Sequence, residues 1–340
     1  MRHATLPGPI TTTDYHTGGE PFRIVTGGVP ELAGRTVLDR RRWAAVHLDP
    51  VRRLLVNEPR GHADMYGGFV TPPNDGGADL GVVFFHNEGY STACGHGTIA
   101  LVTWAVETGR VTPRGDDVTV DVPSGRLACT VRRDRDGRVE SVRFRNVPSY
   151  CAAREVAVRT AAVGPVTLDV GFGGAFYGSL DVRVLGLGVE ASALPALIAL
   201  QRELRPSLEG AVDLVHPLEP ELRGVYGVIF WEPLPDDRPG ARAQRNVTVF
   251  ADGEIDRSPC GSGTSARLAI MHARGEIAIG ELLVHRSIVD SVFDGRIVAV
   301  TDVAGLAAVV TEVEGRAYRT GDHVFSLDPR DPVGTGFLLR

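Results

Sequence analysis

Lysine is entirely absent from the 340 residues of this chain, so its basic side chains are arginines and ten histidines. Enzymes that use pyridoxal phosphate hold it as a Schiff base on a lysine, and this absence excludes that chemistry. Cysteine is scarce as well. The four cysteines, at positions 94, 129, 151 and 260, contain no Cys-X-X-Cys pair, so we predict no disulfide framework.

Several further features are missing, and each excludes a class of protein. The formal net charge of −6 gives no basic surface for nucleic acid. No stretch approaches the ~18 apolar residues that a membrane span needs, and residues 1–15 lack the apolar core of a signal peptide. No Rossmann or P-loop fingerprint is present. We therefore expect a cytoplasmic protein that uses no cofactor and no metal.

A repeated motif is the most informative feature present. Cys-Gly-X-Gly-Thr occurs at residues 94–98 and again at 260–264, which is 166 residues later (260 − 94). Each copy begins an apolar, helix-like run that ends at a glycine 15 residues after the cysteine (109 − 94 and 275 − 260). The repeat predicts a duplicated half-molecule that brings two thiols to one site.

Strand patterns around the two motifs support the duplication. Apolar segments precede the cysteines at 80–86 and 247–251. After the helices, segments at 118–122 and 287–293 lead through Gly-Arg turns into 127–131 and 297–300. Strands dominate and each half has one long apolar helix, so we predict an α+β fold with two similar, strand-rich lobes.

The lobe boundaries follow from the same pattern. We predict a first lobe over residues 10–155, which carries Cys94 and is completed by a C-terminal strand at 324–340. A second lobe over 156–323 carries Cys260. Residues 192–206 predict a surface helix that ends at Pro206, and 233–243 predict an exposed loop.

The chemistry of the motif follows from its place at the start of a helix. Free backbone N–H groups and the positive end of the helix stabilise a thiolate, so we expect a lowered thiol pKa. The same N–H groups can hold a carboxylate. Two such turns would place a sulfur on either face of an α-carbon, and that arrangement inverts a stereocentre. The predicted catalytic residues are Cys94 and Cys260, and the turn residues predicted to bind the carboxylate are Gly95, His96, Gly261, Ser262 and Gly263.

Asp256, four residues before the second cysteine, is predicted to bind the ammonium or ring nitrogen of the substrate. Alternatives remain open for several of these residues. Asp256 could cap the helix, and His96 could only pack. Cys129 and Cys151 are expected to be buried apolar residues. A zinc site from Cys94, His96, Cys260 and His16, a redox dithiol, and a binding protein without catalysis are competing interpretations.

These motifs resemble the proline racemase family, essentially from end to end. The resemblance lies in SPCGSGTSA (258–266), CGHGTIA (94–100), HTGGEP (16–21) and MYG (65–67). It implies a diaminopimelate-epimerase-like fold with the active site in the cleft between two lobes. It also implies no cofactor and a homodimer that acts on an imino acid. With that substrate in view, Phe250 is a candidate for an apolar side of the ring pocket and Tyr66 for a contact to a ring substituent.

The resemblance leaves two reactions open. The segments EPRGHADMYG (58–67), HNEGYST (86–92) and GGAFY (173–177) resemble the trans-3-hydroxyproline dehydratases of the family. Dehydratases of that branch typically carry threonine in place of the second cysteine, whereas this chain has Cys260. Elimination needs one base, while epimerisation also needs a proton donor on the other face. We therefore expect a two-thiol epimerase or racemase, with 4-hydroxyproline favoured over proline, and a dehydratase as the alternative.

Overall fold

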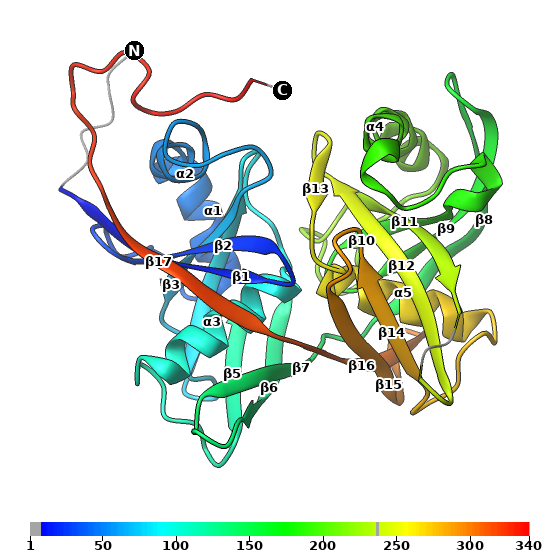
Figure 1. Cartoon of the computed structure of the whole chain (residues 1–340), viewed down its shortest axis with the longest axis horizontal. Coiled ribbons are helices and arrows are strands. Elements are labelled where there is room, and N and C mark those ends of the chain that lie inside the picture. Colours follow the sequence, from blue (N-terminus) through cyan, green and yellow to red (C-terminus); the bar gives the residue numbers. More distant parts are fainter. Residues whose placement is uncertain (1–7, 236–237, 340) are drawn as a thin grey trace. The chain divides into compact units, whose positions relative to one another are not determined.

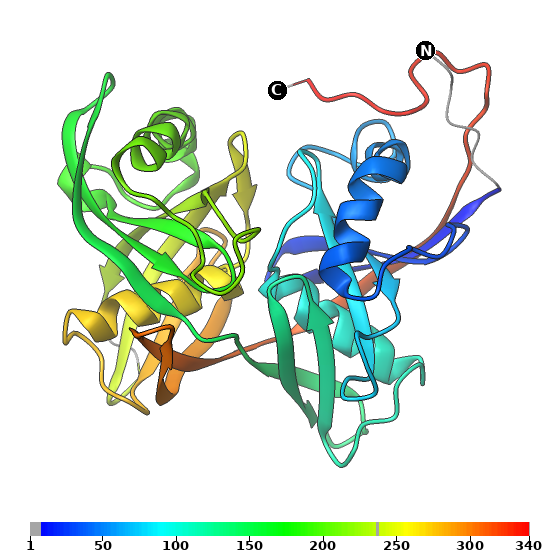
Figure 2. The ribbon, with the colours of Figure 1, turned by 180° about the vertical axis from the view of Figure 1, so that it is seen from behind.

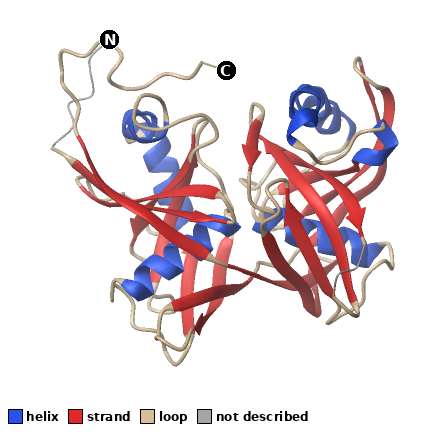
Figure 3. Cartoon of the chain, in the orientation of Figure 1, coloured by secondary structure: helices blue, strands red, loops and turns tan. Residues whose placement is uncertain are grey.

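Both ends of the chain belong to the same half of the protein. The computed structural model describes residues 8–235 and 238–339, and these divide into two compact units (Figure 1). The first unit takes the chain up to Val142 and again from Arg316, and the second takes Arg143–Gly315. Each unit is built mainly from strands (Figure 3).

The first unit is a twisted mixed sheet, in which some neighbouring strands are antiparallel and others parallel. Strand β17 pairs antiparallel with β1, and then β1–β2 is antiparallel, β2–β3 parallel, β3–β4 antiparallel, β4–β5 parallel and β5–β6 antiparallel. Its elements are β1 (Ile10–Thr17), β2 (Glu20–Gly27), α1 (Val37–His47), α2 (Asp49–Val56), β3 (Tyr66–Thr71), β4 (Leu80–His86), α3 (Gly95–Glu107), β5 (Asp117–Val122), β6 (Gly125–Arg133) and β17 (Ala317–Phe325), with β7 (Val139–Arg145) crossing to the second unit.

The second unit repeats this pattern strand for strand. Here β8–β9 and β9–β10 are antiparallel, β10–β11 parallel, β11–β12 antiparallel, β12–β14 parallel and β14–β15 antiparallel. Its elements are β8 (Tyr150–Thr160), β9 (Gly164–Phe172), β10 (Phe176–Asp181), the short helices η1 (Val182–Leu185) and η2 (Ala191–Ala193), α4 (Leu194–Ala211), β11 (Val225–Leu234), β12 (Ala241–Phe250), β13 (Glu254–Asp256), α5 (Gly261–Ala273), β14 (Leu282–Ser287), β15 (Val292–Val303) and β16 (Leu306–Gly315).

Helices α3 and α5 occupy matching places in the two units. Each begins directly after the cysteine of its motif, and nearly all of its residues are buried. Such burial on all sides is expected of a helix that strands surround. In the first unit α3 packs on β1, β2, β3, β6 and β17, and in the second α5 packs on β8, β9, β10, β15 and β16 (Figures 1 and 2). The predicted α+β fold of two similar lobes, each around a central helix, is confirmed.

The boundaries between the lobes differ from those predicted. The chain leaves the first unit at Val142, not at 155, because β8 pairs along its length with β9 of the second unit. It returns at Arg316, not at 324, because β17 pairs with β1 over Ala317–Phe325. Beyond Phe325 the described residues form no further strand.

One predicted strand is a turn, and one predicted turn is a strand. The segment predicted as a strand at 287–293 contains the end of β14 and a turn with Asp290 at φ 62°. The predicted turn at 294–296 lies inside β15. A Cβ on Gly295 would lie 2.9 Å from Cγ2 of Thr264, so this glycine lets α5 pack closely on the sheet.

Two other predicted limits change. Helix α4 continues through Pro206 to Ala211, because Leu200, Leu204 and Leu208 form one buried face on both sides of the proline. The loop predicted at 233–243 is shorter, since β11 ends at Leu234 and β12 begins at Ala241. Asp236 and Asp237 of that loop lie outside the described residues.

Candidate active site

Cys94 is the N-cap residue of α3. Its backbone is extended (φ −156°, ψ 98°), and its sulfur accepts a hydrogen bond from the Gly97 N–H at 3.2 Å. The Cys94 carbonyl accepts hydrogen bonds from the N–H and the hydroxyl of Thr98, at 3.0 and 2.8 Å. The first turn of α3 therefore gives the thiol one backbone donor, the Gly97 N–H.

The His96 ring lies beside this sulfur. Its two nitrogens are 3.5 and 3.6 Å from Cys94 Sγ, and its carbonyl accepts a hydrogen bond from the Thr17 hydroxyl at 2.9 Å. Tyr66 and Phe22 pack edge-on against the ring, with centroid distances of 5.0 and 5.9 Å. His96 is thus fixed next to the sulfur by its backbone and by two aromatic rings.

Gly97 cannot be replaced by a larger residue without displacing the sulfur. A Cβ at this position would lie 2.4 Å from Cε2 of Phe22 and 2.7 Å from Cys94 Sγ. We expect Gly97→Ala to destabilise the protein by about 1–3 kcal/mol and to lower turnover. Thermal unfolding and a turnover assay check this. Gly210→Ala, at an open position in α4, is the control and should stabilise by about 0.5–1 kcal/mol; equal behaviour of the two variants would contradict the argument.

Cys260 is the N-cap residue of α5, but its backbone is unlike that of Cys94. Its φ of 62° and ψ of 100° lie in a region that residues with a side chain rarely adopt. The Thr264 N–H donates to its carbonyl at 2.7 Å. A Cβ on Gly263 would lie 2.9 Å from Cys260 Sγ, so the sulfur rests closely on the first turn of the helix.

Asp256 is linked to the Cys260 turn through Ser258. One carboxylate oxygen of Asp256 accepts hydrogen bonds from the Ser258 N–H and hydroxyl, at 2.8 and 2.7 Å. The Ser258 hydroxyl oxygen in turn accepts the Cys260 N–H at 3.1 Å. Asp256 is therefore tied to the turn before α5, but neither it nor Cys260 caps the helix through its side chain, so the alternative interpretation as a helix cap is wrong.

Burial is the main influence on the pKa values of the Asp256 carboxyl and the Cys260 thiol. It raises the pKa of Asp256 to about 6, against which the hydrogen bonds from Ser258 act. Burial, followed by the charge of Asp256, raises the pKa of the Cys260 thiol well above its ordinary range. The lowered pKa predicted from the helix N-terminus is therefore wrong for Cys260, because desolvation outweighs the helix dipole. In the free protein this side chain is therefore a protonated thiol.

An aromatic cluster extends from the second thiol. The Tyr177 hydroxyl lies 3.9 Å from Cys260 Sγ and 2.7 Å from the Ser262 hydroxyl. Tyr226 meets the Tyr177 ring edge-on and stacks on Phe250, with centroids 5.6 and 5.3 Å apart. Phe250 therefore belongs to the same aromatic cluster as Tyr177, whose hydroxyl contacts the sulfur.

The remaining cysteines lie elsewhere. All four cysteines belong to the described residues, and none forms a disulfide. Cys129 is buried in β6, and Cys151 is half-buried in β8. His16 accepts the Gly19 N–H at 3.2 Å and packs on Tyr318. Within 8–235 and 238–339, no group of three or more His, Cys, Asp or Glu side chains could hold a metal ion.

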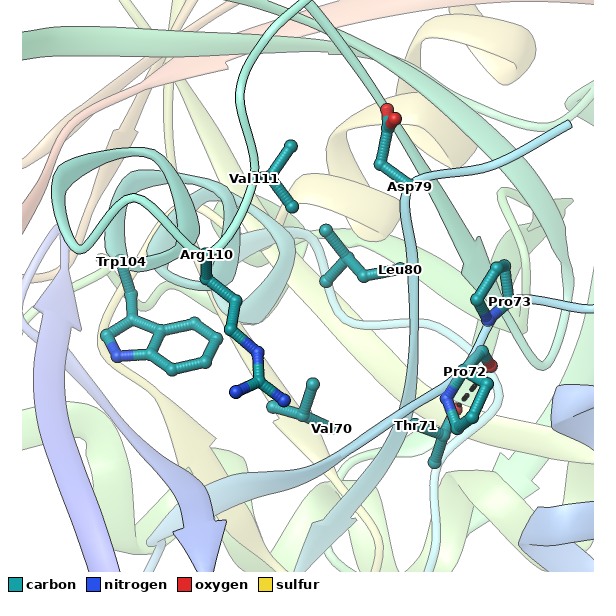
Figure 4. A pocket seen from close by; sticks show the side chains of 9 residues that line it. All are labelled: Val70, Thr71, Pro72, Pro73, Asp79, Leu80, Trp104, Arg110 and Val111. Atoms are coloured by element: carbon teal, nitrogen blue, oxygen red, sulfur yellow. Dashed lines mark hydrogen bonds between the residues drawn. The ribbon is translucent and has the colours of Figure 1, made fainter. Parts of the chain in front are cut away.

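A separate cavity of about 250 Å³ lies in the first unit (Figure 4). Trp104, Arg110 and Asp79 line it together with apolar residues, and Figure 4 shows the Arg110 side chain extending between Trp104 and Val70. Trp104 follows Cys94 by ten residues on α3 (104 − 94), which is about 15 Å along the helix. This cavity is therefore not part of the Cys94 turn.

Several residues at the two turns did not stand out in the sequence. Phe22 and Tyr177 contact the turns from other strands, and only the tertiary pairing brings them there. Ser258 stands beside the cysteine motif, and a serine two residues after Asp256 is the one local signal that was available. Figure 1 shows α3 and α5, the helices that begin at the two turns.

The similarity of this chain to known proteins extends beyond the two motifs. The sequence profile of proline racemases matches residues 12–338. The chain belongs to the proline racemase family. Members of this family are isomerases, and dehydratases, which are lyases, occur among its relatives. The resemblance predicted from the motifs is confirmed.

Three similar proteins show the range of activities. A trans-3-hydroxy-L-proline dehydratase from Bacillus cereus is 45% identical over 97% of this chain and 98% of its own. A 3-hydroxyproline 2-epimerase from Burkholderia multivorans is 46% identical over the same shares. The crystal structure of a hydroxyproline epimerase from Agrobacterium vitis, with bound trans-4-hydroxy-L-proline, is 32% identical with a TM-score of 0.90, over 98% of this chain and 96% of that one. This protein has the family's diaminopimelate-epimerase-like fold.

None of the described helices combines the length and the apolar character needed to cross a membrane.

Proposed function

We propose that this protein is a two-thiol hydroxyproline 2-epimerase that uses no cofactor. The observation that carries the proposal is the presence of a cysteine at the N-cap of both central helices, Cys94 before α3 and Cys260 before α5. Both sulfurs touch the first turn of their helix, where backbone N–H groups can bind the carboxylate of an imino acid.

The proposed reaction is a proton transfer in two steps. Cys94, as thiolate, removes the α-proton of one C2 epimer, and the carbanion is stabilised by donors to its carboxylate. The Cys260 thiol then delivers a proton to the opposite face. The enzyme is left with Cys94 as thiol and Cys260 as thiolate, and the other C2 epimer reacts with the roles exchanged. A buried, protonated Cys260 suits the donor role.

The relatives bear on the position of the substrate hydroxyl. The two relatives at 45% and 46% identity are named for 3-hydroxyproline, whereas the structure with 4-hydroxyproline is 32% identical. We therefore propose 3-hydroxyproline before 4-hydroxyproline, which reverses the preference given by the sequence alone. Proline is the third candidate.

Dehydration is the second candidate function. Once the α-proton of trans-3-hydroxy-L-proline has left, the carbanion can expel the 3-hydroxyl group without any second thiol. The 45% identity to a dehydratase of that substrate favours this route. Incubation with trans-3-hydroxy-L-proline, trans-4-hydroxy-L-proline and L-proline, followed by chiral chromatography, separates the candidates. A C2 epimer supports the epimerase, a cyclic imine alone supports the dehydratase, and no reaction refutes both.

The charge of Asp256 predicts the pH dependence. Its pKa of about 6 means that the carboxylate is ionised above that pH and protonated below it. If it binds the substrate ammonium, kcat/KM falls about tenfold per unit as the pH drops below about 6. Asp256→Asn should lower kcat/KM by about 10- to 100-fold and abolish this acidic limb. A pH profile of both proteins from 4.5 to 8 checks this; an acidic limb that persists in the variant contradicts it.

The working form that we propose is a cytoplasmic homodimer with a small imino acid as its partner. Sedimentation equilibrium tests the dimer.

A further inference from the structure

His285 is the buried ionisable residue of the second unit that the proposed reaction does not use. It lies fully buried in β14, beside Gln244 of β12 in the parallel pairing. Its Nδ1 is 2.8 Å from the hydroxyl oxygen of Thr264, which lies in the first turn of α5. Burial, and then the charge of Arg267, lower its pKa to about 3, so the ring is neutral at pH 7.

The direction of this hydrogen bond follows from the neighbours. The Thr264 hydroxyl donates its single proton to the Pro259 carbonyl at 3.3 Å. Nδ1 of His285 must then carry the proton that is donated to Thr264. The other nitrogen, Nε2, is buried with no hydrogen-bond partner among the described residues. This tautomer leaves a lone pair unpaired there, which is less costly than an orphaned N–H.

The peptide group between Pro259 and Cys260 is therefore held on both sides. Its carbonyl accepts from Thr264, behind which lies His285. Its N–H donates to Ser258, behind which lies Asp256. The donors all point the same way along this chain of hydrogen bonds, so each bond polarises the next.

These hydrogen bonds hold the peptide group next to Cys260, whose backbone is strained. Cys260 has a φ of 62° and a ψ of 100°, a conformation that persists only where its surroundings enforce it. Cys94 has ordinary extended angles, and its matching threonine, Thr98, bonds to the Cys94 carbonyl of its own helix turn. His285 of β14 reaches this helix directly, through the 2.8 Å contact with Thr264.

We propose that His285, acting through Thr264, is the positioning residue that holds Cys260 in its strained conformation and aims its sulfur at the substrate. The proposal rests on the proposed function for its consequence in turnover, since a misplaced sulfur protonates the carbanion poorly. The proposal does not require His285 to contact the substrate. A change at His285 is therefore expected to affect Cys260 and not Cys94.

The test uses variants that remove or keep the donor. Thr264→Val and His285→Leu break the chain, whereas Thr264→Ser keeps the hydroxyl and His285→Asn keeps an N–H near the position of Nδ1. Thr103→Val is the matched control, because it removes a buried hydroxyl that bonds to the Ile99 carbonyl at 2.8 Å within α3. Thermal unfolding is recorded for each protein, and Thr264→Val carries the test if His285→Leu does not fold.

Two measurements distinguish a misplaced Cys260 sulfur from a general loss of structure. The first is the rate at which iodoacetate alkylates each cysteine, followed by peptide mass spectrometry. We expect a fall of about tenfold at Cys260 and no change at Cys94. The second is the rate of inversion compared with the rate of α-proton exchange in D₂O, for the C2 epimer that Cys94 deprotonates. Inversion should fall by about 10- to 100-fold and exchange far less, with recovery in the two conservative variants.

Other outcomes decide against the proposal. Wild-type inversion and alkylation in Thr264→Val and His285→Leu overturn it, as does an equal loss at both cysteines. If the wild type converts no imino acid, the proposed function fails, but the alkylation rates still decide whether His285 positions Cys260.

Discussion

We expect Cys94→Ser and Cys260→Ser each to lower epimerisation by about 10²- to 10⁴-fold. A serine hydroxyl is a far weaker acid than a thiol, so it neither removes the α-proton as an alkoxide nor returns a proton at a useful rate. Each thiol performs one half of every turnover, and the loss of either stops both directions. The rates of inversion from both C2 epimers give the measurement.

The matched controls for this prediction are the other two cysteines. Cys129→Ser and Cys151→Ser replace a buried and a half-buried thiol away from the two helix turns. Both should keep epimerisation near the wild-type rate, although Cys129→Ser costs some stability. Iodoacetate should inactivate the wild type and both controls. Full activity in Cys260→Ser would contradict the two-thiol account.

The second large effect is a change of reaction. Cys260→Thr should abolish inversion, by at least about 10²-fold, while elimination of water from trans-3-hydroxy-L-proline continues within about tenfold of its wild-type rate. The reason is that elimination needs only the base, Cys94, whereas inversion also needs the donor. The products, a C2 epimer or a cyclic imine, are separated by chromatography.

A second variant makes this prediction robust. A β-branched residue is strained at a φ of 62°, so Cys260→Thr is compared with Cys260→Ala, which removes the donor with less strain. Both should lose inversion in the same measure. If inversion survives in either variant, Cys260 is not the required proton donor. If elimination is lost together with inversion, Cys260 does more than donate a proton.

The local structure of the two cysteine turns was predictable, because it lies in short stretches of sequence. The two Cys-Gly-X-Gly-Thr motifs each contain a thiol, the glycines that let it approach the helix turn, and the start of the helix. Strands such as β4 and β5 followed from their apolar pattern. These features depend on neighbours in the chain, so the sequence displays them directly.

What the sequence could not predict depends on distant pairing or on burial. His285 of β14 reaches Thr264 of α5 from 21 residues further along the chain, through tertiary packing. Gly295 resembles a turn glycine, yet it serves as a point of close contact for α5. The raised pKa of Cys260 comes from desolvation, which no local pattern encodes.

The most direct test of the central claim is proton NMR of the wild type with trans-3-hydroxy-L-proline in D₂O. The account predicts that the α-proton signal disappears while the C2 epimer appears with deuterium at C2, because a solvent-exchanged Cys260 delivers the second proton. An epimer that retains its α-proton throughout would indicate a single base serving both faces. A substrate whose α-proton never exchanges would contradict the account altogether.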